Sequence, residues 1–154
     1  MKHENYRIQV LDFLHQQSLM TLSTVSPSGQ PEAATLFYLF DSDFTFYFVT
    51  REETRKVKNI NKNPKVAIVI SDDKTMNIQV EGRAVELNGV NVISDLLSQV
   101  SQKALPEESA EFWPPVMRME GGEYKFYKVS PTMIRVFDFG KSKDPWADPY
   151  VIIL

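Results

Sequence analysis

Hydrophobic positions recur at steps of three and four residues near the start of the chain, and at steps of two through most of the remaining sequence. The first spacing is that of one helix face, and it predicts a helix over residues 3–17. Alternation bounded by turn signals predicts antiparallel strands, because successive side chains of a strand point to opposite faces. Strands are expected over residues 18–25, 32–40, 44–49, 65–70, 75–87 and 123–139, the last interrupted at Ser130-Pro131.

A short helix is expected between the third and fourth of these strands. Thr50 is its candidate N-cap, and Glu53 three residues later completes a capping-box pattern. Val57 and Ile60 supply the buried face of this helix, and Asn63-Pro64 ends it. Helical spacing returns after residue 89 and again from residue 106, whereas the tail from residue 140 has the character of a loop.

This succession of elements indicates the fold class. About six strands at short spacing, with helices only at the start, between two strands and late, predict a mainly β protein built as a small closed or half-closed barrel. An α+β sandwich is the alternative, and a doubly wound parallel sheet is disfavoured because helices and strands do not alternate regularly. The chain of 154 residues fits one domain over residues 1–154.

Composition excludes several classes of protein. The chain has no cysteine, which rules out a disulfide scaffold, a thiolate metal site and a cysteine nucleophile. No apolar run approaches the ~20 residues of a membrane helix, and the first residues do not resemble a signal peptide, so we expect a cytoplasmic protein without a membrane contact. A net charge of −3 argues against a nucleic-acid partner.

The sequence offers few groups for unaided catalysis. His3 and His15 are the only histidines, and their separation of twelve positions suits two surface or helix-end residues rather than a ligand pair. Glycine-rich phosphate loops and a serine nucleophile elbow are both missing from the sequence. Any catalysis would therefore depend on a borrowed cofactor.

The most informative segment is residues 48–57, Phe-Val-Thr-Arg-Glu-Glu-Thr-Arg-Lys-Val. Free amides at a helix start, together with Arg55 and Lys56, would bind a phosphate group. The alternative is a solvated basic helix face, since Arg51, Arg55 and other cations fall on one side at ~100° per residue. Lys56 does not fit that alternative, because it lies beside Ile60 at the edge of the buried face. Glu52 and Glu53 would oppose an anion site if their side chains turned toward it, so both interpretations stay open.

Motifs in a fixed order carry a family resemblance. Thr50 is followed by Thr54-Arg55-Lys56, then by Asn63-Pro64-Lys65-Val66-Ala67, and then by Val80-Glu81-Gly82-Arg83-Ala84. An upstream strand pair over residues 22–37 adds to the pattern. These features resemble the pyridoxamine 5'-phosphate oxidase-like family, whose members show Tyr/Phe-x-Thr, Ser/Thr-Arg-Lys, Asn-Pro-x-Val-Ala and Val-x-Gly-x-Ala. The match covers residues 18–87, more than a third of the chain.

The resemblance implies a six-stranded antiparallel split β-barrel of Greek-key type that binds FMN, usually as a homodimer with the flavin at the subunit interface. In such proteins the Arg-Lys pair and the preceding Thr hold the FMN phosphate. The matching positions here are Arg55, Lys56 and Thr50.

The resemblance also assigns ring and ribityl contacts. The second strand runs along the flavin, which corresponds to Ala34, Thr35, Leu36 and Phe37. A polar residue on a later strand reaches the ring edge from the partner subunit, and the match falls on Asn77, with Gln79 on the same face as the fallback. Without the family, Thr35, Asn77 and Gln79 would be interpreted as a solvated strand face.

Departures from the family pattern bear on the substrate. True pyridoxamine phosphate oxidases carry a Lys where this chain has Leu39, and an Arg-x-His pattern near the C-terminus, whereas residues 138–154 contain neither Arg nor His. Phe137 stands at the position of the family's late Trp, and Trp146 is a possible substitute; both are candidates, with Phe37, for a pocket wall. Vitamin B6 phosphate oxidation is therefore not expected, and the chain is more similar to short bacterial relatives called general stress proteins.

The resemblance leads to two candidate functions. The first is a flavin-dependent oxidoreductase that uses FMN on an unidentified small molecule or electron donor. The alternative is a non-enzymatic FMN carrier or redox sensor. Split barrels that bind deazaflavin or haem are a lesser alternative, because haem would need an axial ligand near the site and both histidines lie on the first helix.

Overall fold

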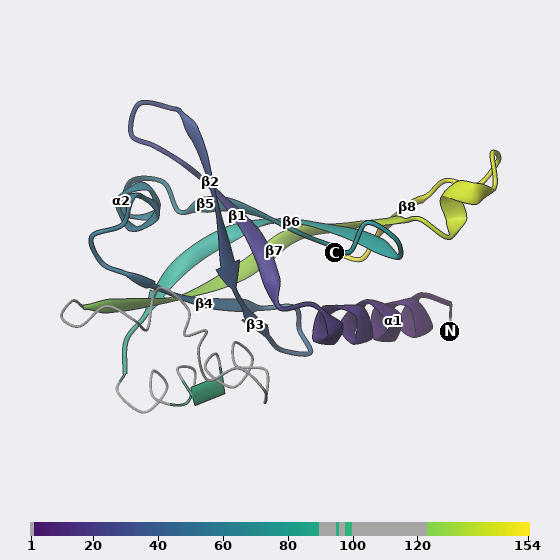
Figure 1. The fold of residues 1–154 in the computed structure, drawn as a ribbon, viewed down its shortest axis with the longest axis horizontal. Coiled ribbons are helices and arrows are strands. Elements are labelled where there is room, and N and C mark those ends of the chain that lie inside the picture. The colour runs from purple at the N-terminus through teal and green to yellow at the C-terminus, as the bar shows by residue number, and fades with distance from the viewer. Residues whose placement is uncertain (1, 90–94, 96–97, 100–122) are drawn as a thin grey trace, which may run out of the picture.

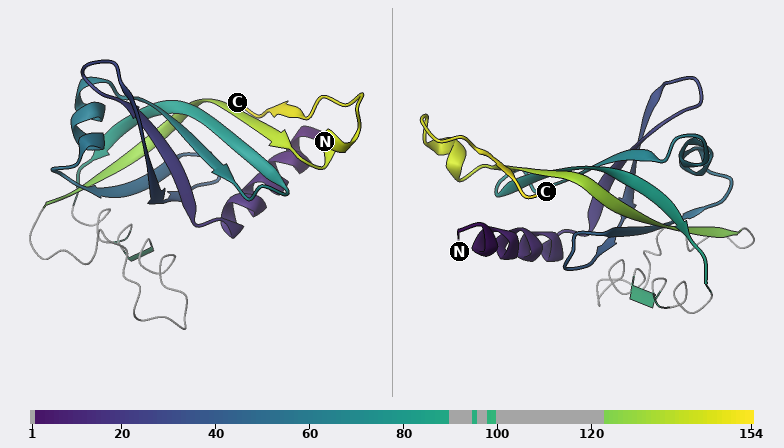
Figure 2. Two further views of the ribbon diagram at one scale, coloured as in Figure 1. Left: turned by 45° about the horizontal axis from the view of Figure 1, so that its top comes forward. Right: turned by 180° about the vertical axis from the view of Figure 1, so that it is seen from behind.

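Most of the described chain lies in one curled antiparallel sheet, with a helix at either end of it (Figures 1 and 2). The computed structural model describes residues 2–89, 95, 98–99 and 123–154, so the helical stretches expected after residues 89 and 106 lie outside the described residues. The elements are α1 (Lys2–Gln16), β1 (Leu19–Val25), β2 (Pro31–Phe37), β3 (Leu39–Phe40), β4 (Phe46–Arg51), α2 (Arg55–Lys62), β5 (Lys65–Ser71), β6 (Met76–Leu87), β7 (Tyr124–Asp138), the 3-10 turn η1 (Lys141–Lys143) and β8 (Tyr150–Ile152).

The pairing order confirms the expected fold class. The strands follow the order β2-β1-β5-β6-β7-β4-β3, with β8 added to β7, and the sheet curls into a half-barrel. The sheet has eight strands where six were expected. One extra strand is β8, in the tail that was interpreted as a loop, and the other arises because the strand expected over residues 32–40 is divided at Tyr38.

Tyr38 marks a change of partner strand. Before it, β2 pairs with β1, and after it, β3 pairs with β4. The Tyr38 side chain is fully buried, and its hydroxyl donates a hydrogen bond to the carbonyl oxygen of Leu14 on α1 (2.8 Å). Burial raises the pKa of Tyr38. The point at which the chain changes its partner strand is thus held to the first helix by this hydrogen bond.

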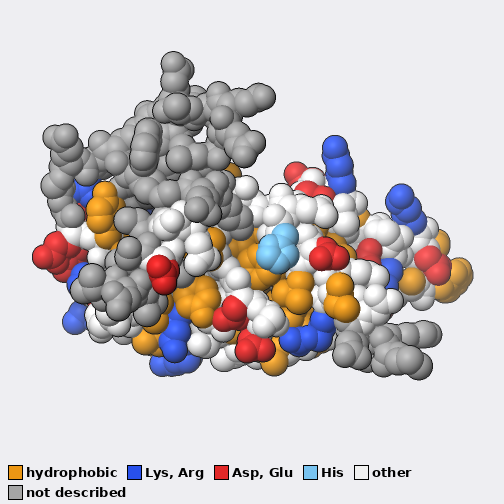
Figure 3. Space-filling model, turned by 90° about the horizontal axis from the view of Figure 1, so that it is seen from below, with side chains coloured by type: hydrophobic (Ala, Val, Ile, Leu, Met, Phe, Trp, Pro, Cys, Tyr) orange, Lys and Arg blue, Asp and Glu red, His pale blue; other side chains and the backbone are white. Residues whose placement is uncertain are grey.

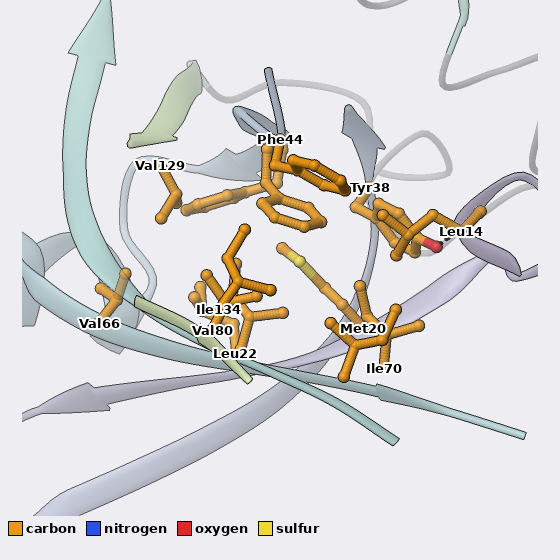
Figure 4. Packing of buried hydrophobic residues seen from close by; sticks show 14 of the residues in the cluster. Leu14, Met20, Leu22, Tyr38, Phe44, Val66, Ile70, Val80, Val129 and Ile134 are labelled. Carbon is orange, nitrogen blue, oxygen red and sulfur yellow. Dashed lines mark hydrogen bonds between the residues drawn. The ribbon is translucent and has the colours of Figure 1, made fainter. Parts of the chain in front are cut away.

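The inner face of the sheet forms the core (Figure 4). Along β6, Met76, Ile78, Val80 and Ala84 are buried, while the residues between them point outward, as the alternation predicted. Helix α1 closes one end of this core with Val10, Phe13 and Leu14. The predicted amphipathic character of the first helix is therefore confirmed by packing.

The long strands β6 and β7 change register near their middle. Glu81 pairs with Met133, but Gly82 pairs with Pro131, so one extra residue of β7 is accommodated there. A Cβ on Gly82 would lie 2.6 Å from the carbonyl oxygen of Ser130, so only glycine fits this close approach. The interruption expected at Ser130-Pro131 is thus a register shift within one continuous strand.

The capping-box prediction for α2 is wrong. Strand β4 continues through Thr50 to Arg51, since both residues pair with β7, and the N-cap of α2 is Thr54. Glu53 forms an ion pair with Arg51 (2.6 Å). Hydrogen bonding with a strand distant in sequence took Thr50 out of the helix start.

The surface carries charges of both signs. Seen from below, hydrophobic side chains lie among acidic and basic ones around α1 (Figure 3), and Ile8 of that helix is about half exposed. No helix in the described part of the chain is both long and apolar enough to cross a membrane.

Candidate functional site

A groove of about 380 Å³ runs between the start of α2 and the neighbouring strands β1 and β2. Its walls combine small or apolar side chains with hydroxyl groups, two cations and two carboxylates: Leu22, Thr24, Glu32, Ala33, Ala34, Glu53, Thr54, Arg55 and Lys56. Helix α2, whose start borders the groove, lies at the end of the sheet opposite to α1 (Figures 1 and 2). The segment singled out for a phosphate group therefore borders a concave site.

Arg55 and Lys56 line the same groove but make different contacts. The Arg55 guanidinium is mostly exposed, and its Nη1 donates to Glu32 Oε1 (3.1 Å). The Lys56 ammonium is half-buried and donates to Thr50 Oγ1 (3.3 Å). Arg55 is thus the exposed cation of the groove and Lys56 the half-buried one.

Lys56 carries a charge that has no counter-ion within the described part of the chain. Among the ion pairs of the described residues, none involves Lys56. Burial, followed by repulsion from Arg55, lowers the pKa of Lys56. A half-buried ammonium is unfavourable unless an anion accompanies it, so this position is suited to receive one.

Two threonine hydroxyls stand beside the ammonium. Thr50 is almost fully buried, and its Oγ1 lies 3.3 Å from the Oγ1 of Thr54, within hydrogen-bond distance. The Thr54 hydroxyl also lies 2.9 Å from the carbonyl oxygen of Arg51, to which it donates. Thr54 was not among the predicted site residues, although it is the first member of the Thr54-Arg55-Lys56 triplet and the family pattern would have identified it.

Carboxylates also lie in the groove. Glu53 does line it, but its side chain is engaged by Arg51, while Glu52 pairs with Lys125 (3.7 Å) and does not line it. Glu32 is the carboxylate in contact with Arg55, and sequence reasoning missed it. No local pattern indicates this contact, because Glu32 and Arg55 are brought together only by the packing of α2 against the strands.

The four predicted positions of the second strand divide between the two faces of β2. Ala34 lines the groove, and Leu36 on the same face packs against the main core. Thr35 points outward and is exposed. Phe37 packs with Val49 and Phe126 in a smaller cluster. Of these four residues, the structure brings only Ala34 together with Arg55 and Lys56.

Asn77 and Gln79 lie on the outward face of β6 and do not line the groove. Gln79 Nε2 donates to Asn77 Oδ1 (3.0 Å), and Gln79 Oε1 accepts from Nη2 (2.6 Å) and Nε (3.1 Å) of Arg135. The Arg135 guanidinium lies over the ring of Tyr150 at 4.8 Å. Within one chain these amides are apart from the cations of α2.

The candidate wall residues also lie outside the groove. Phe137 contacts the rings of Phe139 and Tyr150, and Trp146 is 94% exposed. His15 is exposed in the last turn of α1, as expected, and its ring contacts that of Phe40 (4.6 Å). The described residues contain no group of three or more histidine and acidic side chains that could hold a metal ion.

Sequence comparison connects this chain to one family. The family model described as pyridoxamine 5'-phosphate oxidase matches residues 7–132. A pyridoxine/pyridoxamine 5'-phosphate oxidase of Rubrobacter xylanophilus is 32% identical over 72 residues, which is 46% of this chain and 33% of that protein. One from Crocosphaera subtropica is 34% identical over 56 residues, 36% of this chain and 26% of that protein. The matches thus span a third or less of the curated relatives.

Solved structures share the fold over nearly the whole chain. General stress protein 26 of Bacillus anthracis superposes with a TM-score of 0.65 and 20% identity, covering 96% of this chain and 98% of that one. A pyridoxamine 5'-phosphate oxidase-related, FMN-binding protein of Nostoc punctiforme gives 0.61 and 15%, covering 94% and 86%. A haem storage protein of Vibrio cholerae gives 0.60 and 13%, covering 80% and 87%.

The family model covers most of the chain, and its span includes both the groove and the strands that form it. The solved structures agree in fold with the family match. This chain belongs to the pyridoxamine 5'-phosphate oxidase family.

Proposed function

We propose that this protein is an FMN-binding flavoprotein that holds the flavin phosphate in the groove beside α2. The observation that carries the proposal is Lys56, a half-buried cation at the groove without a carboxylate partner among the described residues. A phosphate group would supply the missing negative charge. The Nostoc punctiforme relative is described as FMN-binding, which agrees with this choice of ligand.

The groove residues fit a phosphomonoester. Lys56 and Arg55 would donate to the phosphate oxygens, and the Thr54 hydroxyl would join them by giving up its bond to the Arg51 carbonyl oxygen. Thr50 does not line the groove, and its Oγ1 would hold the Lys56 ammonium in place. The side chains of Ala33 and Ala34 on β2 are small, which leaves room for a ribityl chain in the groove. When bound, FMN would supply hydride or electron transfer that the side chains of the groove do not provide.

A second copy of the chain completes this proposal. Cross-strand pairing places Val69, Gln79, Arg135 and Ile152 in one row on the outward face of the sheet. Val69 is 40% exposed and Ile152 57% exposed, so the row around Gln79 offers apolar surface to a partner. We therefore retain Asn77 and Gln79 as contacts to the flavin ring of a partner subunit in a homodimer, with Phe137 and Trp146 as candidate wall residues from the same side.

The substrate is not vitamin B6 phosphate in this proposal. Leu39, which stands at the position of the family's substrate lysine, is half-buried and packs with Val49 and Phe126. We propose an oxidoreductase acting on another small molecule. Among the described residues, no histidine or tyrosine that would transfer a proton lines the groove, an observation that favours an FMN carrier or redox sensor as the second candidate. Haem is disfavoured because His15, in the last turn of α1, does not line the groove.

Titration of the purified protein with FMN tests the phosphate site. Replacing both Arg55 and Lys56 by alanine should weaken FMN binding at least about tenfold, because charge-assisted hydrogen bonds contribute about 1.5–3 kcal/mol each. The matched control replaces Lys58 and Lys62, two exposed cations of the same helix outside the groove, and should leave the affinity within about twofold. Equal effects of the two double variants would contradict the proposal. Reduction by NADH or NADPH, followed by turnover with an acceptor, separates an oxidoreductase from a carrier.

A further inference from the structure

Glu32 brings a negative charge into the groove proposed to bind phosphate. Its side chain is only 20% exposed, and both carboxylate oxygens are engaged. Oε1 accepts from Nη1 of Arg55 (3.1 Å), and Oε2 accepts from Nδ2 of Asn59 (2.8 Å). The carboxylate thus already forms an ion pair with Arg55, one of the two cations that a ligand phosphate would use.

The carboxylate is fixed from the protein side. Asn59 is 2% exposed, and its amide nitrogen donates to Thr24 Oγ1 (2.9 Å) as well as to Glu32. Buried amide donors of this kind are costly to leave unpaired, so Asn59 retains Glu32 in place. Arg55, by contrast, is 79% exposed and held by a solvent-screened ion pair, which is easily exchanged for another anion. In this pair the carboxylate is the anchored member and the guanidinium is the one able to move.

The charges around the groove can be balanced residue by residue. Glu53 is neutralised by Arg51, and Glu32 by Arg55, which leaves Lys56 as the uncompensated cation among the described residues that line the groove. A phosphomonoester brings two negative charges and therefore needs both Lys56 and Arg55. It obtains Arg55 only by drawing the guanidinium away from Glu32.

We infer that Glu32 is a built-in anion that competes with the ligand's phosphate for Arg55, and so limits the affinity for phosphorylated ligands. This inference rests on the proposed function and adds a residue that sets its strength. A competing carboxylate keeps Arg55 ordered in the empty groove. It also weakens binding of any anion that cannot displace it from the guanidinium, and it does not act on an uncharged ligand.

The test compares FMN with riboflavin, which lacks the phosphate, in titrations of the purified protein. Glu32→Gln keeps an oxygen for Asn59 but removes the charge, so FMN should bind about tenfold more tightly while riboflavin binding is unchanged. The matched control is Glu52→Gln, which changes the net charge equally at a residue outside the groove and should leave both affinities within about twofold. Glu32→Asp is the second variant: it keeps a carboxylate on β2 but shortens the side chain that reaches Arg55, so the ratio of FMN to riboflavin affinity should shift in the same direction.

Each outcome separates the inference from the proposed function. A tenfold gain in the ratio of FMN to riboflavin affinity, confined to the Glu32 variant, supports competition. FMN binding by the unaltered protein with no gain, or a loss, in the Glu32 variant overturns the inference alone, and assigns Glu32 to positioning Arg55. A lack of FMN binding in every variant overturns the proposed function and the inference together.

Discussion

The barrel interior and the groove beside α2 adjoin one another along the same face of strand β1, but different kinds of side chain line them. The interior is filled by apolar side chains from the strands and α1, so its stability comes from burial. The groove retains a half-buried ammonium, two carboxylates and two threonine hydroxyls around an open volume. One strand serves both regions, since Leu22 belongs to the core cluster and also lines the groove.

The largest effect is expected on the free energy of unfolding, from a substitution in the barrel interior that leaves the groove residues unchanged. Ile78 on β6 is fully buried, and Ile78→Ala should lower the free energy of unfolding by about 3 kcal/mol, because a cavity remains where the side chain was. Urea unfolding followed by fluorescence measures the loss. Val85→Ala, at a half-exposed position of the same strand, should cost below about 1 kcal/mol. Similar losses at both positions would mean that β6 is not buried on one face as described.

The next largest effect is expected for Lys56→Met, which should change FMN affinity and the free energy of unfolding differently. Lys56→Met keeps the length of the side chain but removes the uncompensated charge, so FMN affinity should fall about tenfold. The free energy of unfolding should stay equal or rise by up to about 1 kcal/mol, because an unpaired half-buried ammonium is unfavourable. Calorimetric titration and urea unfolding of the same preparation measure both. Lys58→Met on the exposed face of α2 is the control, and lower stability with unchanged affinity in Lys56→Met would refute this division of roles.

The smallest effect is a pH dependence carried by the same ammonium. Burial lowers the pKa of Lys56 from 10.5, so the unfolded chain holds this proton more tightly than the folded one. Between the lowered pKa and 10.5, the stability of the free protein should therefore rise slightly with pH relative to Lys56→Met. FMN affinity should fall across the same window, since the phosphate requires the charged form. Titrations at several alkaline pH values check both, and parallel profiles for the two proteins would contradict the assignment.

Local patterns predicted the elements better than their partners. The alternation along residues 75–87 predicted the buried face of β6, because side-chain direction in a strand depends only on position. The division at Tyr38 was not predictable, since both halves have strand character and only the curled sheet gives them different neighbours. Strand β8 was missed because three residues are too few to show a period. The N-cap was misplaced for the same tertiary reason, as β7 pairs with Thr50.

The residues of the candidate site also divide into those that local sequence predicted and those that depend on tertiary packing. Arg55 and Lys56 were predicted from adjacent residues at a helix start, and the structure places both on one groove. Glu32 and Asn59 could not be predicted, because their contact depends on how α2 packs against β1 and β2. Asn77 and Gln79 lie on the outward face of β6, away from the groove of their own subunit, and their contact with a flavin stays a prediction for the proposed homodimer.

Tyr38 connects the two edge strands of the curled sheet. The two outermost strands of the pairing order, β2 and β3, are consecutive in the chain and separated by this one residue. The circumference is therefore joined by covalent bonds at a point where a hydrogen-bonded ladder could fray. An extra residue inserted beside Tyr38 would lengthen the circumference and pull the hydroxyl from its contact with α1, whereas the same insertion in the Ser26–Gly29 turn would only lengthen a loop. The circumference of the barrel is thus limited by the one-residue backbone connection between β2 and β3.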